Sequence, residues 1–437
     1  MPSKSRTHKD ECCRYMYFKE GTLFTKLDEY VKSAVNNPIN QRHLPIHRMH
    51  SFKNILYLIR QLGIKRSACY FLSLPVRFLF RFNRTIFDFK TEIRSHYKIR
   101  ELISNANIRR LPALSDNLKT EIDQLFNRYN LPDNTIWHQF FISINDIEKP
   151  GYLSEYIYYS FIEPRLNVSS MAGAYSDKNI YQKIFPSLHH PRTVLRYING
   201  RYYDADYTHL SKTEARHRLL EYKDMMIIKP SINSGRGRNI YKVTAENSMI
   251  NLNESTKEFD DLAQICPEGF IVQEMLEQHP DLSKFHPESL NTIRITTFRF
   301  QQDITVLSAI LKMGNHGHYL DKMAFNGLSC GIDSSGTLFS NALDNHFKKQ
   351  TQHPESGVFF QGFHIPGFQN VCDIVTNTHK QLPYFDIISW DVAISPESKP
   401  VLIEINLRSQ GIIYQQAIFG PLFGDYSKEL LENLFNT

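Results

Sequence analysis

Apolar residues at helical spacing characterise the first part of the chain. Ser115, a residue type that commonly caps the start of a helix, precedes an apolar series spaced by about one helical turn, formed by Leu118, Ile122, Leu125 and Phe126. Pro132 ends this series, and a second helix is expected to begin near Asp133. The pattern therefore predicts that residues 1–150 are mainly helical.

From about residue 151 the pattern changes to short apolar segments separated by glycine, proline and asparagine. Such segments are typical of strands, and the clearest cover residues 225–230, 269–276, 291–300, 305–313, 387–394 and 400–406. The last two are joined by a turn, which predicts a hairpin, and an amphipathic helix is expected over residues 426–435. Because strands and helices do not alternate regularly, we expect an α+β domain over residues 151–437.

The composition is that of a folded, globular protein. The chain has 437 residues, of which 41% are hydrophobic and 22% are charged, and these values exclude an intrinsically disordered chain. Its 51 basic and 45 acidic residues leave a net charge of +6, too small an excess to indicate nucleic-acid binding. Six scattered cysteines without a CxxC spacing favour a reducing compartment. With no signal-type leader and no apolar run of membrane-spanning length, the predicted location is the cytoplasm.

The segment 52–82 is aromatic and basic, and no acidic residue lies between Ser51 and Phe87. Two interpretations stay open. Its helices can pack on the rest of the protein with lysine and arginine side chains reaching outward, which is the more common arrangement. Alternatively, the segment can lie on an anionic membrane surface, which would place the protein peripherally at the inner face of the membrane.

A lysine at a strand end, followed by a loop with glycines, is the first candidate for chemistry. Lys229 lies near the end of the apolar segment 225–230, and Gly235 and Gly237 follow among small residues and arginines. Glycine lets backbone N–H groups approach phosphate oxygens closely, and lysine and arginine add positive charge. An ordinary turn between two strands has the same pattern, so this motif alone does not decide the function.

Two carboxylates and an amide near the C-terminus form the second candidate. Glu404 and Asn406 are two residues apart on an apolar strand and point to the same face, and Asp391 lies on the preceding strand. Antiparallel pairing of the two strands would bring the three side chains together. Carboxylate and amide oxygens suit Mg²⁺ ions that also hold substrate phosphates. A solvent-facing strand or a salt bridge is the alternative explanation for these acids.

Two further segments carry candidate residues. Asn291 and Arg294 lie in the predicted strand 291–300, where an arginine can stabilise a transferred phosphoryl group or can simply be exposed. The segment 273–277 ends another strand, where backbone groups can contact an adenine and a carboxylate can hold a ribose. The sequence has no P-loop, GxGxxG, GxSxG or HExxH pattern, which argues against Walker-type hydrolysis, Rossmann redox chemistry and zinc hydrolysis.

Taken in order, these motifs resemble the ATP-grasp superfamily. The chain is further similar to the sugar-transfer-associated ATP-grasp family, whose motifs match residues 278–280, 290–297, 331–333, 353–354, 362–368, 389–393 and 404–406. That family is associated with genes for cell-surface polysaccharide assembly. The resemblance implies an ATP-grasp fold in which two lobes, about residues 151–275 and 276–437, grip ATP between them.

The resemblance also implies a role for each candidate residue. ATP would be contacted by Lys178, Lys229, the flap residues Ser234, Gly235, Arg236 and Gly237, the hinge residues Gln273, Glu274 and Leu276, and Glu277 at the ribose. Arg294, with Asn291, would stabilise the transferred phosphoryl group. Two Mg²⁺ ions would be held by Asp391, Glu404 and Asn406, and the acceptor side would include Arg408, Ser409 and Gln410.

The activity that the resemblance implies is ATP-dependent carboxylate–amine ligation through an acyl phosphate. The partners would be a small carboxylate and an amine, with a sugar acid or an amino acid as the component modified for cell-surface polysaccharide, and no nucleic acid. Two alternatives stay open. One is a kinase that phosphorylates an acceptor other than a carboxylate, and the other is a non-catalytic nucleotide-binding partner of glycan-assembly enzymes.

Overall fold

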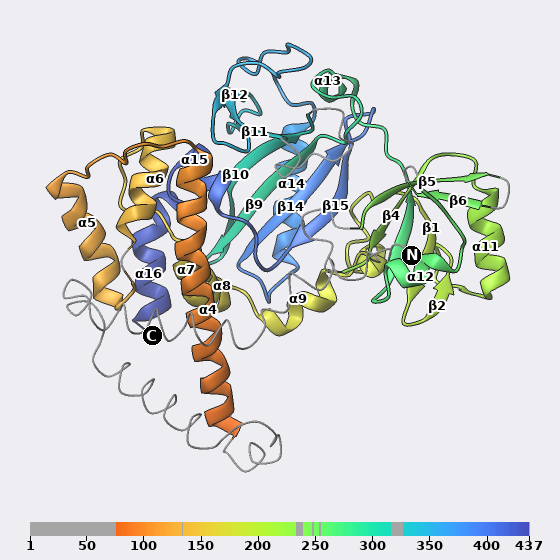
Figure 1. Ribbon diagram of the computed structural model, residues 1–437, viewed down its shortest axis with the longest axis horizontal. Helices are drawn as coiled ribbons and strands as arrows, with labels where there is room; N and C mark the ends of the chain where they lie inside the picture. The colour runs from red at the N-terminus through yellow and green to blue at the C-terminus, as the bar shows by residue number, and fades with distance from the viewer. Residues whose placement is uncertain are drawn as a thin grey trace, which may run out of the picture. The chain divides into compact units, whose positions relative to one another are not determined.

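The computed structural model describes residues 76–132, 134–232, 239–246, 249–252, 255–315 and 327–436 (Figure 1). The chain divides into two compact units, residues 1–83 and 84–437. The described part of the first unit is the start of helix α4 (Val76–Asn105), and all other elements below belong to the second unit. None of the helices in these ranges combines the length and the apolarity needed to cross a bilayer.

An antiparallel sheet of eight strands is formed by residues 193–274. From one edge to the other its strands are β3 (His209–Leu210), β2 (Arg201–Tyr203), β1 (Thr193–Ile198), β8 (Phe270–Glu274), β4 (Met226–Pro230), β5 (Tyr241–Glu246), β6 (Met249–Leu252) and β7 (Ser255–Lys257). Helices α11 (Lys212–Glu221) and α12 (Asp261–Ile265) contribute Leu219 and Leu262 to the core of this sheet. Helix α11 begins with a capping box between Ser211 and Glu214, which satisfies backbone N–H groups at its start.

A second antiparallel sheet, of seven strands, is formed by residues 292–406. Its strands in spatial order are β13 (Lys349–Gln350), β12 (Leu338–Leu343), β11 (Leu328–Ile332), β10 (Asp303–Met313), β9 (Thr292–Phe300), β14 (Ile387–Ile394) and β15 (Pro400–Asn406). The six strand segments predicted from the sequence are all present in the two sheets, and the predicted hairpin is the pair β14–β15.

Strand alternation gives the second sheet two different faces. On β9, Ile293 and Ile295 belong to a core that also contains Val371 and Val375 of helix α14 (Phe368–Lys380). Because neighbouring side chains point to opposite faces, Arg294 and Thr296 lie on the other face of the sheet. Figure 1 shows α14 running along the sheet, so this helix covers one face, and Arg294 lies on the opposite face.

The remaining helices are short, and most of them lie before the first sheet or after the second. They are α5 (Asp116–Phe126), α6 (Thr135–Asn145), α7 (Glu155–Ile157), α8 (Glu163–Leu166), α9 (Ser169–Tyr175), α10 (Tyr181–Ile184), α13 (Pro280–Ser283), α15 (Ile413–Phe419) and α16 (Ser427–Phe435). The helix predicted after Ser115 is confirmed as α5, and the Ser115 hydroxyl accepts the N–H of Leu118 at 3.2 Å.

The helical part packs on the second sheet rather than standing apart from it. Phe126 of α5 and Phe140 of α6 share one buried core with Phe298 of β9 and Ile387 of β14. Ile99 and Leu102, near the end of α4, join the same core. An α+β fold with a helical N-terminal region is therefore confirmed for the part of the chain that the structure describes.

Candidate functional site

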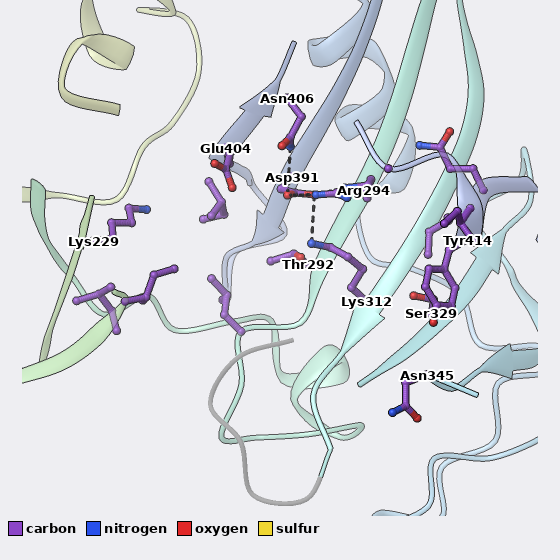
Figure 2. Close-up of a pocket in the computed structure, with 18 of the residues that line it drawn as sticks. Lys229, Thr292, Arg294, Lys312, Ser329, Asn345, Asp391, Glu404, Asn406 and Tyr414 are labelled. Atoms are coloured by element: carbon purple, nitrogen blue, oxygen red, sulfur yellow. Dashed lines mark hydrogen bonds and ion pairs between the residues drawn. The ribbon is translucent and has the colours of Figure 1, made fainter. Parts of the chain in front are cut away.

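A cavity of about 670 Å³ opens between strands of both sheets and the end of helix α4. Its walls come from β4 and β8 of the first sheet, from β9, β10, β14 and β15 of the second sheet, and from α15. Cavities of several hundred Å³ that combine apolar walls with a few converging polar groups are typical of small-molecule sites. The cavity collects most of the residues predicted from the sequence, and Figure 2 shows the arrangement of ten that line it.

The centre of the cavity is a row of three charged residues on neighbouring strands. The register places Glu404 of β15 opposite Asp391 of β14, and Asp391 opposite Arg294 of β9. Arg294 donates two parallel hydrogen bonds to Asp391, with Nε 2.9 Å from Oδ1 and Nη2 2.7 Å from Oδ2. The antiparallel pairing of two strands that are adjacent in the sequence thus brings the predicted acids together.

Asp391 is buried and ionised. Burial alone would raise its pKa, but the positive charges of Arg294 and of Lys312, whose Nζ lies 3.3 Å from Oδ1, hold the pKa of Asp391 well below its ordinary value. Asn406 lies on the same side, with Nδ2 3.5 Å from Oδ2 of Asp391. Figure 2 shows these contacts as dashed lines converging on Asp391.

Glu404 is paired with a buried lysine from an earlier part of the chain. Lys178 Nζ lies 2.8 Å from Glu404 Oε1, and the Lys178 side chain is only 5% exposed. Burial opposes ionisation of Glu404, yet the charges of Lys178 and, more weakly, Lys229 lower the pKa of this carboxyl. The backbone N–H of Lys178 donates to the Ser231 carbonyl at 2.9 Å, so this lysine is fixed beside the end of β4.

The centre carries an excess of positive charge. Among the described residues, four basic side chains line it (Lys178, Lys229, Arg294 and Lys312), against two carboxylates (Asp391 and Glu404), which leaves a net charge of +2. Lys229 is itself buried at 8% exposure, so its charge faces the cavity and not bulk water. A weakly solvated site with this balance favours a polyanion such as a chain of phosphates.

The donor set also suits a hard divalent cation. Asp391, Glu404 and Asn406 present two carboxylates and one amide oxygen from two paired strands, and Mg²⁺ prefers such oxygen ligands. Within the described ranges no group of three or more His, Cys, Asp and Glu side chains could hold a metal ion, so the fit depends on the amide of Asn406. The two carboxylates are compensated by Lys178, Arg294 and Lys312, and a bound ion would share them with these cations.

An apolar slot adjoins the charged centre. Ile227 of β4 and Ile403 of β15 line it together with Met275 and Leu276, which follow β8. The preceding residue, Glu274, is held in place because its backbone N–H donates to the Arg192 carbonyl at 2.9 Å and its carboxylate accepts the Arg192 N–H at 3.0 Å. The predicted hinge residues Gln273, Glu274 and Leu276 all line the cavity.

Several predicted residues lie elsewhere. Glu277 is exposed and is not part of the cavity wall, so the structure does not bring it to the ribose position that the sequence predicts. Asn291 is fully buried beneath the site, where its amide donates to the carbonyls of Leu282 and His286 at 2.9 and 3.0 Å. These bonds hold the start of β9, and Asn291 does not line the cavity.

The predicted acceptor residues lie outside the cavity wall, and the predicted flap lies outside the described residues. Arg408 and Ser409 are exposed and Gln410 is buried, and none of these three lines the cavity, whereas the following Gly411 does. The flap residues Ser234, Gly235, Arg236 and Gly237 lie outside the described residues. The same holds for residues 52–75 of the basic aromatic segment, and the side chains of its last residues, 76–82, are also not described.

Sequence reasoning missed a second group of cavity residues. Lys312 is the only charged residue of the apolar segment 305–313. A charged residue within an apolar strand is also the pattern that identified Glu404, so the sequence does contain a signal for Lys312. Glu101 of α4, Asn345 and Tyr414 also line the cavity, but they stand in polar or mixed segments without a local pattern. The packing of α4 and α15 on the second sheet brings Glu101 and Tyr414 to the site, and Asn345 reaches it from the loop between β12 and β13.

Comparison with known proteins gives one family. The model of the family described as sugar-transfer associated ATP-grasp matches residues 159–423. No curated protein matches this chain.

Among solved structures, similarity is found to the VanG D-Ala:D-Ser ligase from Enterococcus faecalis, with 10% identity, a TM-score of 0.36, and coverage of 60% of this chain and 61% of that chain. An L-amino acid ligase from Bacillus licheniformis has 12% identity and a TM-score of 0.31, with coverage of 62% and 48%. A biotin carboxylase from Campylobacter jejuni has 10% identity and a TM-score of 0.35, with coverage of 60% and 46%. The chain spans less than two thirds of the length of each of these structures.

Proposed function

This chain belongs to the sugar-transfer associated ATP-grasp family, and we propose that it uses ATP and Mg²⁺ to join a carboxylate to an amine. The observation that carries the proposal is the cavity centre, where four basic side chains exceed two carboxylates beside an apolar slot. In this assignment the adenine occupies the slot at Ile227, Leu276 and Ile403, and the phosphates extend toward Lys178 and Lys229.

The carboxylates and the amide of the β14–β15 pair are the proposed metal ligands. Asp391, Glu404 and Asn406 would hold two Mg²⁺ ions, which when bound supply positive charge to the phosphate oxygens. Lys178 and Arg294 remain in contact with these carboxylates and keep their oxygens oriented into the cavity.

The chemistry assigned to the protein is positioning and charge neutralisation. A substrate carboxylate is a poor electrophile, and its oxygen attacks the γ-phosphorus so that ADP departs and an acyl phosphate forms. The amine loses the proton that makes it an ammonium, its nitrogen attacks the acyl carbon, phosphate leaves, and loss of a second proton from the nitrogen gives the amide. Arg294 and Lys312 stand where negative charge develops on the transferred phosphoryl group, and such fixed charges lower the barrier without rearranging during the reaction.

The substrates are proposed from the family. Because that family is sugar-transfer associated, we infer that the carboxylate or the amine is a sugar acid, an amino sugar or an amino acid used in glycan assembly.

The proposal is tested by thermal unfolding with Mg²⁺ and ATP. We expect wild type to be stabilised by about 2.7 kcal/mol at a ligand concentration one hundredfold above Kd, since only the folded state binds. Glu404→Gln should lose most of the stabilisation that depends on Mg²⁺. Glu397 is an exposed glutamate in the turn of the same hairpin, and Glu397→Gln should be stabilised as wild type is. A well-folded wild type that shows no shift with the nucleotide, with or without Mg²⁺, would contradict the proposal.

A further inference from the structure

The cavity continues beyond the charged centre, away from the proposed nucleotide slot. Figure 2 shows Lys229 and Glu404 on one side of the Asp391–Arg294 pair, and Ser329, Asn345 and Tyr414 on the opposite side. We call this opposite side the distal end. Gln415 follows Tyr414 there, Glu101 lies one helical turn before Asn105, whose carbonyl contacts His346 beside Asn345, and Glu155 lies two residues after Leu153, which is hydrogen-bonded to Gln416.

Two contacts hold residues of the distal end in place. The rings of Tyr414 and Phe347 are stacked, with centroids 4.9 Å apart and planes 10° from parallel. His346 Nδ1 lies 3.1 Å from the Asn105 carbonyl at the end of α4, which ties this helix to the loop that carries Asn345. These two contacts hold Tyr414 and the loop of Asn345 in place within the cavity wall.

A chain of buried hydrogen bonds sets the orientation of Gln415. The Gln410 amide donates to the Ile387 carbonyl at 2.8 Å, so its oxygen accepts from the Ser389 hydroxyl at 3.0 Å. Ser389 then accepts from the Thr296 hydroxyl at 2.9 Å, and Thr296 accepts from Gln415 Nε2 at 2.7 Å. Because each hydroxyl has one proton to donate, the chain runs in one direction.

In this direction the amide oxygen of Gln415, a residue of the cavity wall, receives no hydrogen bond. Gln415 is 2% exposed and lines the cavity, and its Oε1 has no hydrogen-bond partner in the structure. A buried amide oxygen that accepts no hydrogen bond is unfavourable and uncommon in native proteins, and a ligand or a water molecule can supply the missing donor. A group that hydrogen-bonds to Gln415 Oε1 must be a donor.

The charges of the distal end indicate the same kind of ligand. Among the described residues, the charged side chains assigned to it are Glu101, Glu155 and Lys98, whose Nζ lies 3.2 Å from Glu101 Oε1, so their net charge is −1. The centre carries +2, so the two parts of one cavity have opposite charge. Glu155 also acts electrostatically on Tyr159, whose hydroxyl accepts the N–H of the cavity residue Gly411 at 3.2 Å.

We propose that the distal end binds the amine substrate as a primary ammonium, with an N–H donated to Gln415 Oε1 and the charge balanced by Glu155 and Glu101. The inference rests on the proposed ligase function and names the chemical class that its second site takes. Both glutamates precede residue 159, so this part of the selectivity would come from residues outside the family match.

The test is thermal unfolding with saturating Mg²⁺ and ADP, to which single amines are added. The probes are glucosamine, ethanolamine and the common L-amino acids, and glucose and ethylene glycol serve as partners without the amine. We expect at least one amine, and neither matched alcohol, to raise the Tm of wild type. Glu155→Gln and Gln415→Met should weaken the Kd of that amine by about tenfold or more, because each removes an acceptor or its charge.

Two controls separate this inference from the function on which it rests. Glu148→Gln changes an exposed glutamate outside the cavity and should bind the amine as wild type does. The shift caused by Mg²⁺ and ADP should be unchanged in Glu155→Gln, which is only partly buried. If the nucleotide stabilises wild type but no amine does, or if both variants bind the amine as tightly as wild type, the amine site is refuted while the nucleotide site stands. Absence of the nucleotide shift itself would refute both.

Discussion

At the scale of single residues, Arg294 connects the proposed metal ligands with the proposed site of phosphoryl transfer. Its guanidinium binds Asp391 through two parallel hydrogen bonds, and its neighbour across the sheet on the other side is Ile310 of β10. The side chain therefore touches the proposed metal ligands while it faces the cavity. A planar fork is needed for this geometry, which an ammonium group cannot reproduce.

Substituting lysine for Arg294 tests this geometry. We expect Arg294→Lys to lower kcat for ADP release by about ten- to a hundredfold, because one charge is kept and the bidentate contact is lost. Nucleotide Kd should change much less, since Lys178 and Lys229 remain. Steady-state kinetics together with nucleotide titration measure both quantities, and an unchanged kcat would remove Arg294 from the proposed phosphoryl-transfer step.

At the scale of elements, a short helical segment accepts hydrogen bonds from the loop after β15. One turn of π-helix (Tyr158–Ile162) leads into α8, and such turns are frequent at functional sites. The Tyr159 hydroxyl accepts the N–H of Gly411, and the Glu163 carboxylate accepts the N–H groups of Ser409 and Gln410. Three successive backbone donors are thus held by two side chains four residues apart, next to the cavity.

The burial of Glu163 predicts that the free energy of unfolding depends on pH. Burial raises the pKa of Glu163 to about 7, from 4.5 in an unfolded chain, although the two backbone N–H groups act against this shift. Between these values the folded state binds more protons than the unfolded state, so the free energy of unfolding falls as pH rises from 4.5 to 7. Glu163→Gln should abolish this contribution, which is about 3 kcal/mol in size.

The measurement is denaturant unfolding of wild type and Glu163→Gln from pH 4.5 to 8. The difference in the free energy of unfolding between the two proteins isolates the contribution of Glu163 from those of other groups. One such group is His379: burial lowers its pKa to about 4, so its contribution to stability changes with pH in the opposite direction. A difference that does not vary with pH would show that Glu163 ionises as it does in water.

How far the sequence predicts the fold depends on the element. The strands β4, β8, β9, β10, β14 and β15 are apolar enough to be recognised, whereas β2, β3 and β13 have two or three residues and β5 carries a mixed pattern. The pairing of Asp391 with Glu404 follows from two strands that are adjacent in the sequence, so it could be predicted. The insertion of β9 between β10 and β14, which brings Arg294 to Asp391, depends on long-range pairing that no local pattern encodes.

At the scale of the whole second unit, the cavity belongs to both sheets. Lys229 and Gln273 come from the first sheet, and Asp391 and Glu404 come from the second. The two sheets that line the cavity have separate hydrophobic cores. The proposed division into two lobes at about residue 275 stays a prediction, but each sheet is formed by one continuous part of the sequence.

Hydrogen exchange tests this shared site. Bound Mg²⁺ and ATP should slow amide exchange in β4 and β8 as well as in β14 and β15, because ordering the ligand restrains both walls. Helix α11, whose residues do not line the cavity, provides an internal control and should change little. Protection restricted to one sheet would mean that the nucleotide does not bridge them.

The order in which cavity residues occur along the chain has a consequence for synthesis. The wall begins at Lys98 and is complete only at Gln415, and both carboxylates of the centre come after helix α14. A product that ends prematurely at α14 would contain Lys178, Lys229 and Arg294 without Asp391 or Glu404. During translation the basic residues of the centre are therefore synthesised before the two acids that neutralise them, and the charge balance of the site can be set only after the last hairpin has left the ribosome.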